Sequence, residues 1–214
     1  MIALSVNVNK VATLRNARGG NVPNVIDAVD ACVRAGAQGI TVHHRADERH
    51  IRRGDVIAIA RHLAAMPVAE RPELNIEGDP RPDLLDLVVE LGPSQCTLVP
   101  VMPGEITSQA GWAVTSDSTL VGGAIERIQS AGVRVSVFID PTPEAVWWAK
   151  SLRADRVELY TEPFARAVER GAPAASESLA VYRRAAELAQ EAGLGVNAGH
   201  DLDETYVRIS EVCR

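Results

Sequence analysis

The sequence predicts an α/β protein of the TIM (β/α)8 type, with about seven βα units in a single domain spanning 1–214. Short β-like runs alternate with helical patterns along the whole chain, and no hairpin signal joins consecutive strands, so the strands should be parallel. Several strands also keep one apolar and one polar face, whereas strands of a doubly wound sheet, covered on both sides, are apolar throughout. The pattern therefore favours a barrel whose interior opens into a site at its C-terminal rim.

The first half of the chain predicts four strands. In the first strand, apolar residues alternate with Ser5, Asn7 and Asn9, as the two-residue period of a strand requires. A loop containing Gly19, Gly20 and Pro23 should follow. The next expected elements are a helix at Val25 to Ala35, a strand within Gly39 to Ile51, a helix at Asp55 to Ala65, a strand at Pro72 to Glu77, a helix at Asp83 to Leu91 and a strand at Gln95 to Val99.

The second half continues the alternation after a long loop. Its expected elements are a helix near Leu120 to Ala131, a strand at Val133 to Asp140, a helix at Glu144 to Ser151, a strand at Arg156 to Thr161, a helix at Glu177 to Ala192 and a strand at Leu194 to Ala198. The segment from Glu162 to Ala175 contains Pro and Gly and is expected to be a loop or an inserted turn. Glu204 to Cys213 is compatible with a last, short helix.

Composition excludes several classes of function. The net charge of −6 and the pI near 5.4 argue against a nucleic-acid or anionic-membrane partner, and no apolar run reaches membrane-spanning length. Three cysteines, far apart and without a CxxC pattern, argue against a disulfide framework or a structural zinc. Nucleotide-binding glycine motifs are absent, and no metal ligands stand four residues apart on a helix. These features indicate a cytoplasmic protein without a bound metal.

Polar residues gather at the carboxyl ends of the expected strands. A lone carboxylate at such a position is more often a helix cap than a catalyst, and Asp140, directly before Pro141, is the clearest case. Several polar residues are nevertheless expected together at one rim of the barrel. Chance alone would not place them all at the same end, so they favour a functional site. The residues expected at the rim are Asn7, Asn9, His43, Arg45, Glu77, Asp140, Glu158 and His200. Glu77, His43 and His200 would form an acid/base set, and Arg18, Arg45 and His50 could bind phosphate.

Several longer motifs carry a resemblance along nearly the whole chain. In order, they are VNVNKVATLRNARGG, GITVHHRADERHI, LNIEG, CTLVP, VSVFID, VELYTEPFA and VNAGHDL. This set resembles the pyridoxine 5′-phosphate synthase family. The resemblance implies a (β/α)8 barrel, commonly an octamer, that needs no metal or organic cofactor. It also implies condensation of 3-amino-2-oxopropyl phosphate with 1-deoxy-D-xylulose 5-phosphate to pyridoxine 5′-phosphate, inorganic phosphate and water.

The resemblance also implies roles for individual residues. His43, Glu77 and His200 would act as acids and bases, and Glu158 would stabilise developing charge. The residues implied to bind substrate are Asn7, Asn9, Lys10, Arg18, Arg45, His50, Thr107 and Asp201. The family's better-known pattern has Asp-His where this chain has Asn9-Lys10, so contacts with the substrate should be altered there, and Lys10 could bind a phosphate or a carbonyl.

A second departure lies at the C-terminus, because the chain ends at Arg214, after the seventh βα unit. The family has an eighth strand there, whose Gly-His pair binds the phosphate of the amino ketone. We expect truncation of the chain, and the alternative is that other chain or a neighbouring subunit closes the gap. Two alternatives stay open: a non-catalytic homologue that binds a sugar phosphate or serves in assembly, and a barrel enzyme such as an isomerase or aldolase. Retention of both VNAGH and RADERH argues against a changed reaction.

Overall fold

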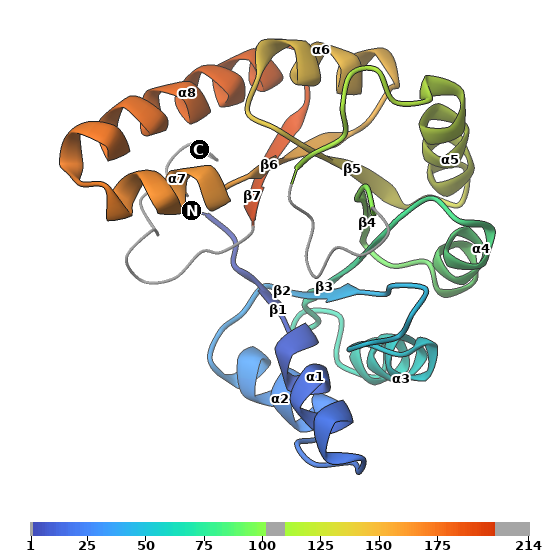
Figure 1. Ribbon diagram of the computed structural model, residues 1–214. Helices are drawn as coiled ribbons and strands as arrows, with labels where there is room; N and C mark the ends of the chain where they lie inside the picture. Colours follow the sequence, from blue (N-terminus) through green and yellow to red (C-terminus); the bar gives the residue numbers. More distant parts are fainter. Residues whose placement is uncertain (1, 102–109, 200–214) are drawn as a thin grey trace. The chain divides into compact units, whose positions relative to one another are not determined.

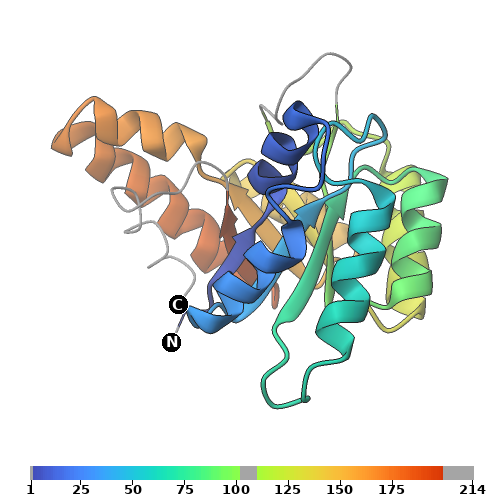
Figure 2. The same ribbon diagram turned by 90° about the horizontal axis from the view of Figure 1, so that it is seen from below.

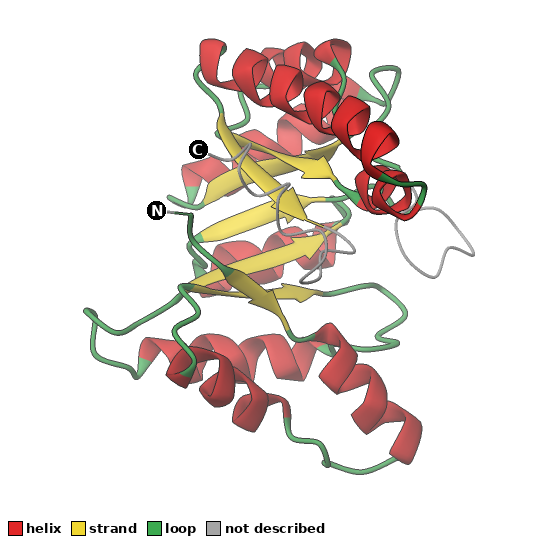
Figure 3. Cartoon of the chain, turned by 90° about the vertical axis from the view of Figure 1, so that its left-hand side faces the viewer, coloured by secondary structure: helices red, strands yellow, loops and turns green. Residues whose placement is uncertain are grey.

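Seven strands alternate with helices in the residues that the computed structural model describes, 2–101 and 110–199 (Figure 1). The strands form a sheet in the order β1-β2-β3-β4-β5-β6-β7. Where the register is defined, between β1, β2 and β3 and between β5, β6 and β7, neighbouring strands run parallel. Figure 3 shows the strands in yellow and the helices that connect them in red. The predicted fold class, an α/β protein of the TIM-barrel type with about seven βα units, is confirmed.

The chain divides into two compact units. Of the described residues, the N-terminal unit comprises Ala3–Thr97 and Arg127–Arg134, and the C-terminal unit comprises Ile2, 98–101, 110–126 and 135–199. The elements up to β4 are β1 (Ser5–Asn7), α1 (Asn9–Arg18), α2 (Val25–Arg34), β2 (Gly39–His43), α3 (Arg53–Ala64), β3 (Glu73–Gly78), α4 (Pro82–Leu91) and β4 (Gln95–Leu98). Those that follow are α5 (Ser118–Ser130), β5 (Arg134–Ile139), α6 (Pro143–Ser151), β6 (Arg156–Tyr160), α7 (Glu162–Glu169), α8 (Ala172–Glu191) and β7 (Gly195–Gly199).

Each unit buries the apolar faces that the sequence pattern assigned to its strands. In the N-terminal unit Ile40, Val42 and Ile76 are fully buried, and Val56 and Ile59 of α3 are buried with them. The C-terminal unit buries the corresponding residues of β5 and β6, namely Val135, Val137, Ile139, Val157 and Leu159. Fully burying one such side chain contributes about 1.5–3 kcal/mol, so these faces hold the strands and fix which side chains point the other way.

Two helices occupy segments for which the sequence predicted loops. The run after β1 is the helix α1, and it ends at Gly19, whose φ of 68° is the left-handed conformation typical of a helix end. The segment beginning at Glu162 is the helix α7, in which Pro163 occupies the first turn, where proline is tolerated. Figure 2 shows α7 and α8 side by side. Between them the rings of Phe164 and Tyr182 meet edge to face, with their centroids 6.0 Å apart.

The helices of the described residues are short or amphipathic. Among them, none combines the length and the hydrophobicity that crossing a bilayer would require. The expected last helix, Glu204 to Cys213, lies outside the described residues.

Candidate active site

His43 is the last residue of β2, and Glu77 is the last but one of β3, the neighbouring strand of the N-terminal unit. The register pairs His43 of β2 with Glu77 of β3, and paired residues on adjacent parallel strands stand about 5 Å apart with their side chains on the same face. His43 is 8% exposed, and Thr41 lies two residues before it on that face and is also buried. An imidazole and a carboxylate are thus held side by side at the carboxyl edge of the sheet, as proton exchange with one substrate requires.

The loop between β2 and α3 carries two arginines, Arg45 and Arg49, that share the carboxylate of Asp47. Arg45 is buried, at 4% exposure, and its Nε lies 3.7 Å from a carboxylate oxygen of Asp47. Asp47 also accepts a hydrogen bond of 2.8 Å from Nε of Arg49, which lowers the pKa of the Asp47 carboxyl. Asp47 therefore stays ionised and orders the two arginines of the loop. This arrangement can present a guanidinium to an anionic group.

His50 closes this loop next to His43. The two imidazole rings have centroids 5.9 Å apart. The pKa of His50 is lowered by burial and by the charge of Arg45, so its neutral form prevails at neutral pH. Nδ1 of His50 accepts a hydrogen bond of 2.9 Å from the backbone N–H of Ile51, which leaves the proton of the neutral ring on Nε2. His50 can thus donate one hydrogen bond to an oxygen of a ligand.

Asn7 and Asn9 fix the start of α1 beside β2. The side-chain oxygen of Asn7 accepts a hydrogen bond of 2.9 Å from the backbone N–H of Asn9. The side-chain oxygen of Asn9 accepts another, also of 2.9 Å, from the backbone N–H of His43. Asn9 begins the helix, although the sequence placed it on the polar face of the first strand. An Asp at position 9 would supply the same acceptor oxygen, so the Asn that departs from the better-known pattern keeps this contact.

Lys10 and Arg18 lie at opposite ends of α1 and both are exposed. They are eight positions apart, which corresponds to about 12 Å along the helix axis. The structure therefore does not bring these two expected substrate-binding residues together, although they share one helix with Asn9.

Asn75 is a site residue that the sequence reading did not single out. It lies two residues before Glu77 on β3, is 8% exposed, and its Nδ2 donates to Oε1 of Glu77 over 3.4 Å. Its own oxygen accepts from the hydroxyl of Thr97 at 3.0 Å and from Nε2 of Gln95 at 3.3 Å. These donors fix the amide so that its N–H groups face Glu77. The alternation in LNIEG, which puts Asn75 on the same face as Glu77, was the available signal.

Glu158 belongs to the C-terminal unit. It lies on β6, is 9% exposed, and pairs in register with Asn197 of β7. Its carboxylate rests against Gly199, because a Cβ built there would stand 2.4 Å from Oε1 of Glu158. Asn197 is held in turn by Arg156, whose Nε donates to its side-chain oxygen at 2.9 Å. Glycine at 199 thus makes room for the carboxylate.

Asp140, expected at the same rim, holds a loop of the C-terminal unit. Its carboxylate accepts a hydrogen bond of 3.1 Å from the backbone N–H of Gly111, and Trp112 donates from its backbone to Phe138 at 2.9 Å. A Cβ at Gly111 would stand 2.3 Å from the backbone of Ile139, so only glycine permits this approach. Three further expected site residues, Thr107, His200 and Asp201, lie outside the described residues.

Comparison with known proteins identifies the family. Residues 4–213 match the family model described as pyridoxal phosphate biosynthesis protein PdxJ. The chain belongs to the PdxJ family. Curated relatives called pyridoxine 5′-phosphate synthase include those of Bacteroides thetaiotaomicron, 49% identical over 94% of this chain and 81% of the relative, and Porphyromonas gingivalis, 47% identical over 97% and 83%. The Flavobacterium johnsoniae relative is 48% identical over 94% and 81%. The family resemblance expected from the motifs is therefore confirmed.

Solved structures with little sequence similarity share the fold. A mandelate oxidase aligns with a TM-score of 0.57 and 15% identity over 90% of this chain and 66% of its own. A putative phosphonomutase from Burkholderia cenocepacia aligns with a TM-score of 0.54 and 14% identity over 87% and 80%. At these identities the likeness concerns the fold alone. The PdxJ relationship carries the functional argument instead.

Proposed function

We propose that this chain is a pyridoxine 5′-phosphate synthase of vitamin B6 biosynthesis. The reaction condenses 3-amino-2-oxopropyl phosphate with 1-deoxy-D-xylulose 5-phosphate and releases pyridoxine 5′-phosphate, inorganic phosphate and water. The PdxJ family match over residues 4–213 supports the assignment. The main support from this chain's own residues is the strand register that pairs His43 with Glu77. Both side chains stand at the carboxyl edge of the sheet, where barrel enzymes carry out their chemistry.

The proposed mechanism consists mainly of proton transfers. Addition of the amine to the ketone, the dehydrations, the loss of phosphate and ring closure each move a proton. Glu77 would shuttle protons together with His200 during imine formation and ring closure, while His43 acts on the other side of the intermediate. Glu158 would stabilise the positive charge that develops on the way. Asn75 supports this division because its Nδ2 donates to Oε1 of Glu77 and so orients the carboxylate.

Recognition of deoxyxylulose phosphate would use the loop that follows β2. Arg45 offers a buried guanidinium, and His50 offers a neutral Nε2–H. Both are groups that bind phosphate oxygens by charge-assisted hydrogen bonds. Asn7, Asn9, Lys10, Arg18, Thr107 and Asp201 complete the proposed set of substrate-binding residues. Asn9 would contribute by holding the backbone of His43, and Lys10 and Arg18 by placing two cations at separate points along α1.

We further propose that the protein acts in the cytoplasm as a homo-oligomer, with phosphorylated small molecules as its partners. Its acidic balance and its three cysteines without a pairing pattern support this setting.

The test of the proposed function is a direct assay with both substrates. Formation of pyridoxine 5′-phosphate, followed by absorbance, should coincide with release of inorganic phosphate. Absence of both products, with a folded protein, would overturn the proposal.

A further inference from the structure

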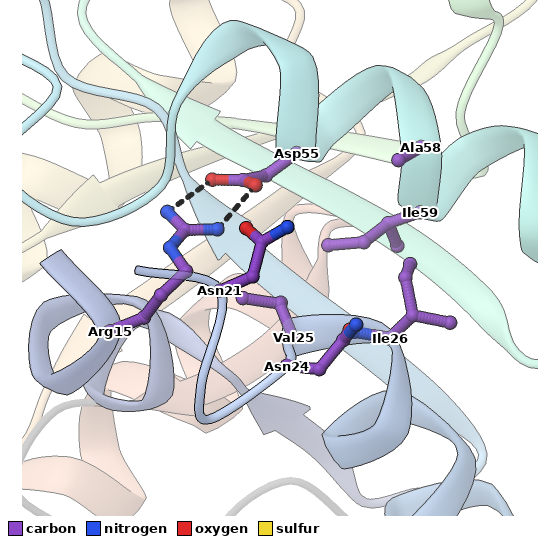
Figure 4. Close-up of a pocket in the computed structure, with 8 residues that line it drawn as sticks. All are labelled: Arg15, Asn21, Asn24, Val25, Ile26, Asp55, Ala58 and Ile59. Carbon is purple, nitrogen blue, oxygen red and sulfur yellow. Dashed lines mark hydrogen bonds and ion pairs between the residues drawn. The ribbon is translucent and has the colours of Figure 1, made fainter. Parts of the chain in front are cut away.

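The helix α1 carries a buried charge on the face that it packs against the rest of the N-terminal unit. Arg15 is 4% exposed, and its guanidinium binds both carboxylate oxygens of Asp55 on α3, at 2.5 and 2.8 Å. Figure 4 shows this pair at the side of a cavity of about 160 Å³, which Asn21 and Asn24 also line. Burial acts to raise the pKa of Asp55, but the hydrogen bonds from Arg15 and from the backbone of Arg52 outweigh it, and the pKa is lowered. Both groups are therefore charged.

The same guanidinium reaches the loop that carries His50. Nη2 of Arg15 donates to the backbone carbonyl of His50 at 3.3 Å. The neighbouring Asn16 donates from Nδ2 to that carbonyl at 2.8 Å and to the carbonyl of Arg49 at 3.1 Å. The side-chain oxygen of Asn16 accepts from Nε and Nη2 of Arg15 at 3.1 and 2.9 Å. Two residues of α1 thus hold the main chain at His50 from outside the site.

Asp55 fixes the other end of this loop. Its second oxygen, Oδ2, accepts a hydrogen bond of 2.8 Å from the backbone N–H of Arg52, as in a helix capping box. The Arg15–Asp55 ion pair therefore anchors the main chain on both sides of Ile51. The imidazole of His50, which this main chain carries, lies beside that of His43, with ring centroids 5.9 Å apart. Any shift of Arg15 or Asp55 would move the His50 ring relative to His43.

Arg15 is buried and Asp55 is partly buried, and an ion pair in such surroundings is not an efficient way to gain stability. Desolvation of both charges offsets most of their attraction, and a well-packed apolar pair of similar volume often stabilises a protein as much or more. An apolar pair could not, however, donate to the His50 carbonyl or accept from the Arg52 backbone. The geometry of the pair therefore fits positioning better than stabilisation.

We infer that Arg15, Asn16 and Asp55 form a clamp that positions the imidazole of His50 to receive the phosphate of the substrate. These three are positioning residues, since they act through the backbone of the loop. The inference rests on the proposed function, because it assigns to His50 the phosphate contact described there. Its consequence is that recognition of deoxyxylulose phosphate depends on residues that face away from the substrate.

The test compares three variants with wild type. Arg15→Met/Asp55→Leu removes the ion pair without leaving a buried charge unpaired, and Asn16→Ala removes only the amide contacts with the two loop carbonyls. If the double variant does not fold, Asn16→Ala alone decides. Arg53→Met is the matched control, because Arg53 also begins α3 but pairs with the exposed Glu90 at 3.4 Å, away from the loop.

Kinetics and the state of His50 are measured well below the melting temperature. For the clamp variants we expect KM for deoxyxylulose phosphate to rise about tenfold or more with a much smaller change in kcat. In NMR spectra of the histidine rings, the pKa of His50 should move up toward its ordinary value as the ring becomes more solvated. Arg53→Met should match wild type in both. Unchanged KM and unchanged His50 signals in the clamp variants, with only a lower melting temperature, would overturn the inference.

Chemical rescue gives an independent readout. In Arg15→Ala, the space left by the guanidinium joins the cavity of about 160 Å³, and millimolar guanidinium chloride should partly restore KM, while equimolar sodium chloride should not. Equal effects of the two salts would contradict a role for the Arg15 guanidinium.

The clamp and the proposed function can fail separately. If wild type forms no pyridoxine 5′-phosphate, the proposed function fails. The His50 signals of Asn16→Ala and of the double variant then still decide whether the clamp positions the ring.

Discussion

At the scale of single residues, Glu77 is the group on which the proposed proton transfers depend most. Replacing Glu77 with Gln keeps the shape and removes the base, so turnover should fall about 10²-fold or more with little change in KM. Glu73→Gln is the matched control on the same strand, because Glu73 binds the Arg134 side chain instead, at 2.5 Å. Steady-state kinetics of both variants check this prediction, and unchanged turnover of Glu77→Gln would rule out an acid/base role.

The lowered pKa values of His44 and His50 predict how the free energy of unfolding depends on pH. Burial and the charge of Arg81 lower the pKa of His44, and burial and Arg45 lower that of His50. The unfolded chain, with a histidine pKa of about 6.5, binds more protons below that pH than the folded chain does. The contribution of the two neutral histidines to the free energy of unfolding should therefore be complete above about pH 6.5. It should be lost as the pH falls through the folded pKa values.

Urea unfolding at pH 8.0, 7.0 and 5.5 measures this dependence. The first two values should agree closely, and the third should be lower. His44→Leu should show a smaller drop to pH 5.5, since it removes one of the two groups. Equal stability of the wild type at all three pH values would refute the interpretation of both histidines.

Some site residues could be predicted from the sequence, and others could not. Period-2 alternation was enough to put His43 and Glu77 on polar faces at strand ends, but it could not show that the register pairs them. The role of Arg15 was hidden because its partners, Asp55 and the His50 carbonyl, are 40 and 35 residues away in sequence. A side chain that acts through the backbone of a distant loop leaves no local pattern.

At the scale of elements, α1 connects the end of β1 to the loop after β2, because Asn9 begins this helix and Asn16 contacts the carbonyls of Arg49 and His50. The sequence predicted a loop there from Gly19, Gly20 and Pro23. In the structure, the buried residues of this helix are Ala12 and Arg15. A helix that buries a charge lacks the apolar stripe by which amphipathic helices are detected. The helix α7 was missed for another reason, since Pro163 and Gly171 mark its two ends rather than a loop.

The contact between α1 and β2 gives a prediction at this scale. Asn9→Leu leaves the backbone N–H of His43 without its acceptor and should cost about 1–3 kcal/mol in the free energy of unfolding. Asn9→Asp keeps an acceptor oxygen and should cost much less. Urea unfolding at pH 8.0 compares the two variants, and an equal loss for both would show that the hydrogen bond to His43 is not the stabilising contact.

At the scale of the whole molecule, the alternation of strands and helices was sufficient to predict the TIM-barrel class and about seven βα units. The strand order, which follows the chain, agrees with that expectation. The decisive signal was that several strands have one polar and one apolar face. This pattern distinguished a barrel interior from a sheet covered by helices on both sides. The roles of Thr107, His200 and Asp201 stay predictions from the family motifs.

We propose that His43 and Glu77, with the loop that carries Arg45 and His50, serve pyridoxine 5′-phosphate synthesis. The most direct measurement supplies purified protein with 3-amino-2-oxopropyl phosphate and 1-deoxy-D-xylulose 5-phosphate and follows both products together. We predict pyridoxine 5′-phosphate and inorganic phosphate in equal amounts, both reduced about 10²-fold or more in rate by Glu77→Gln. A folded protein that forms neither product, or that forms both at the same rate without the Glu77 carboxylate, would contradict the claim.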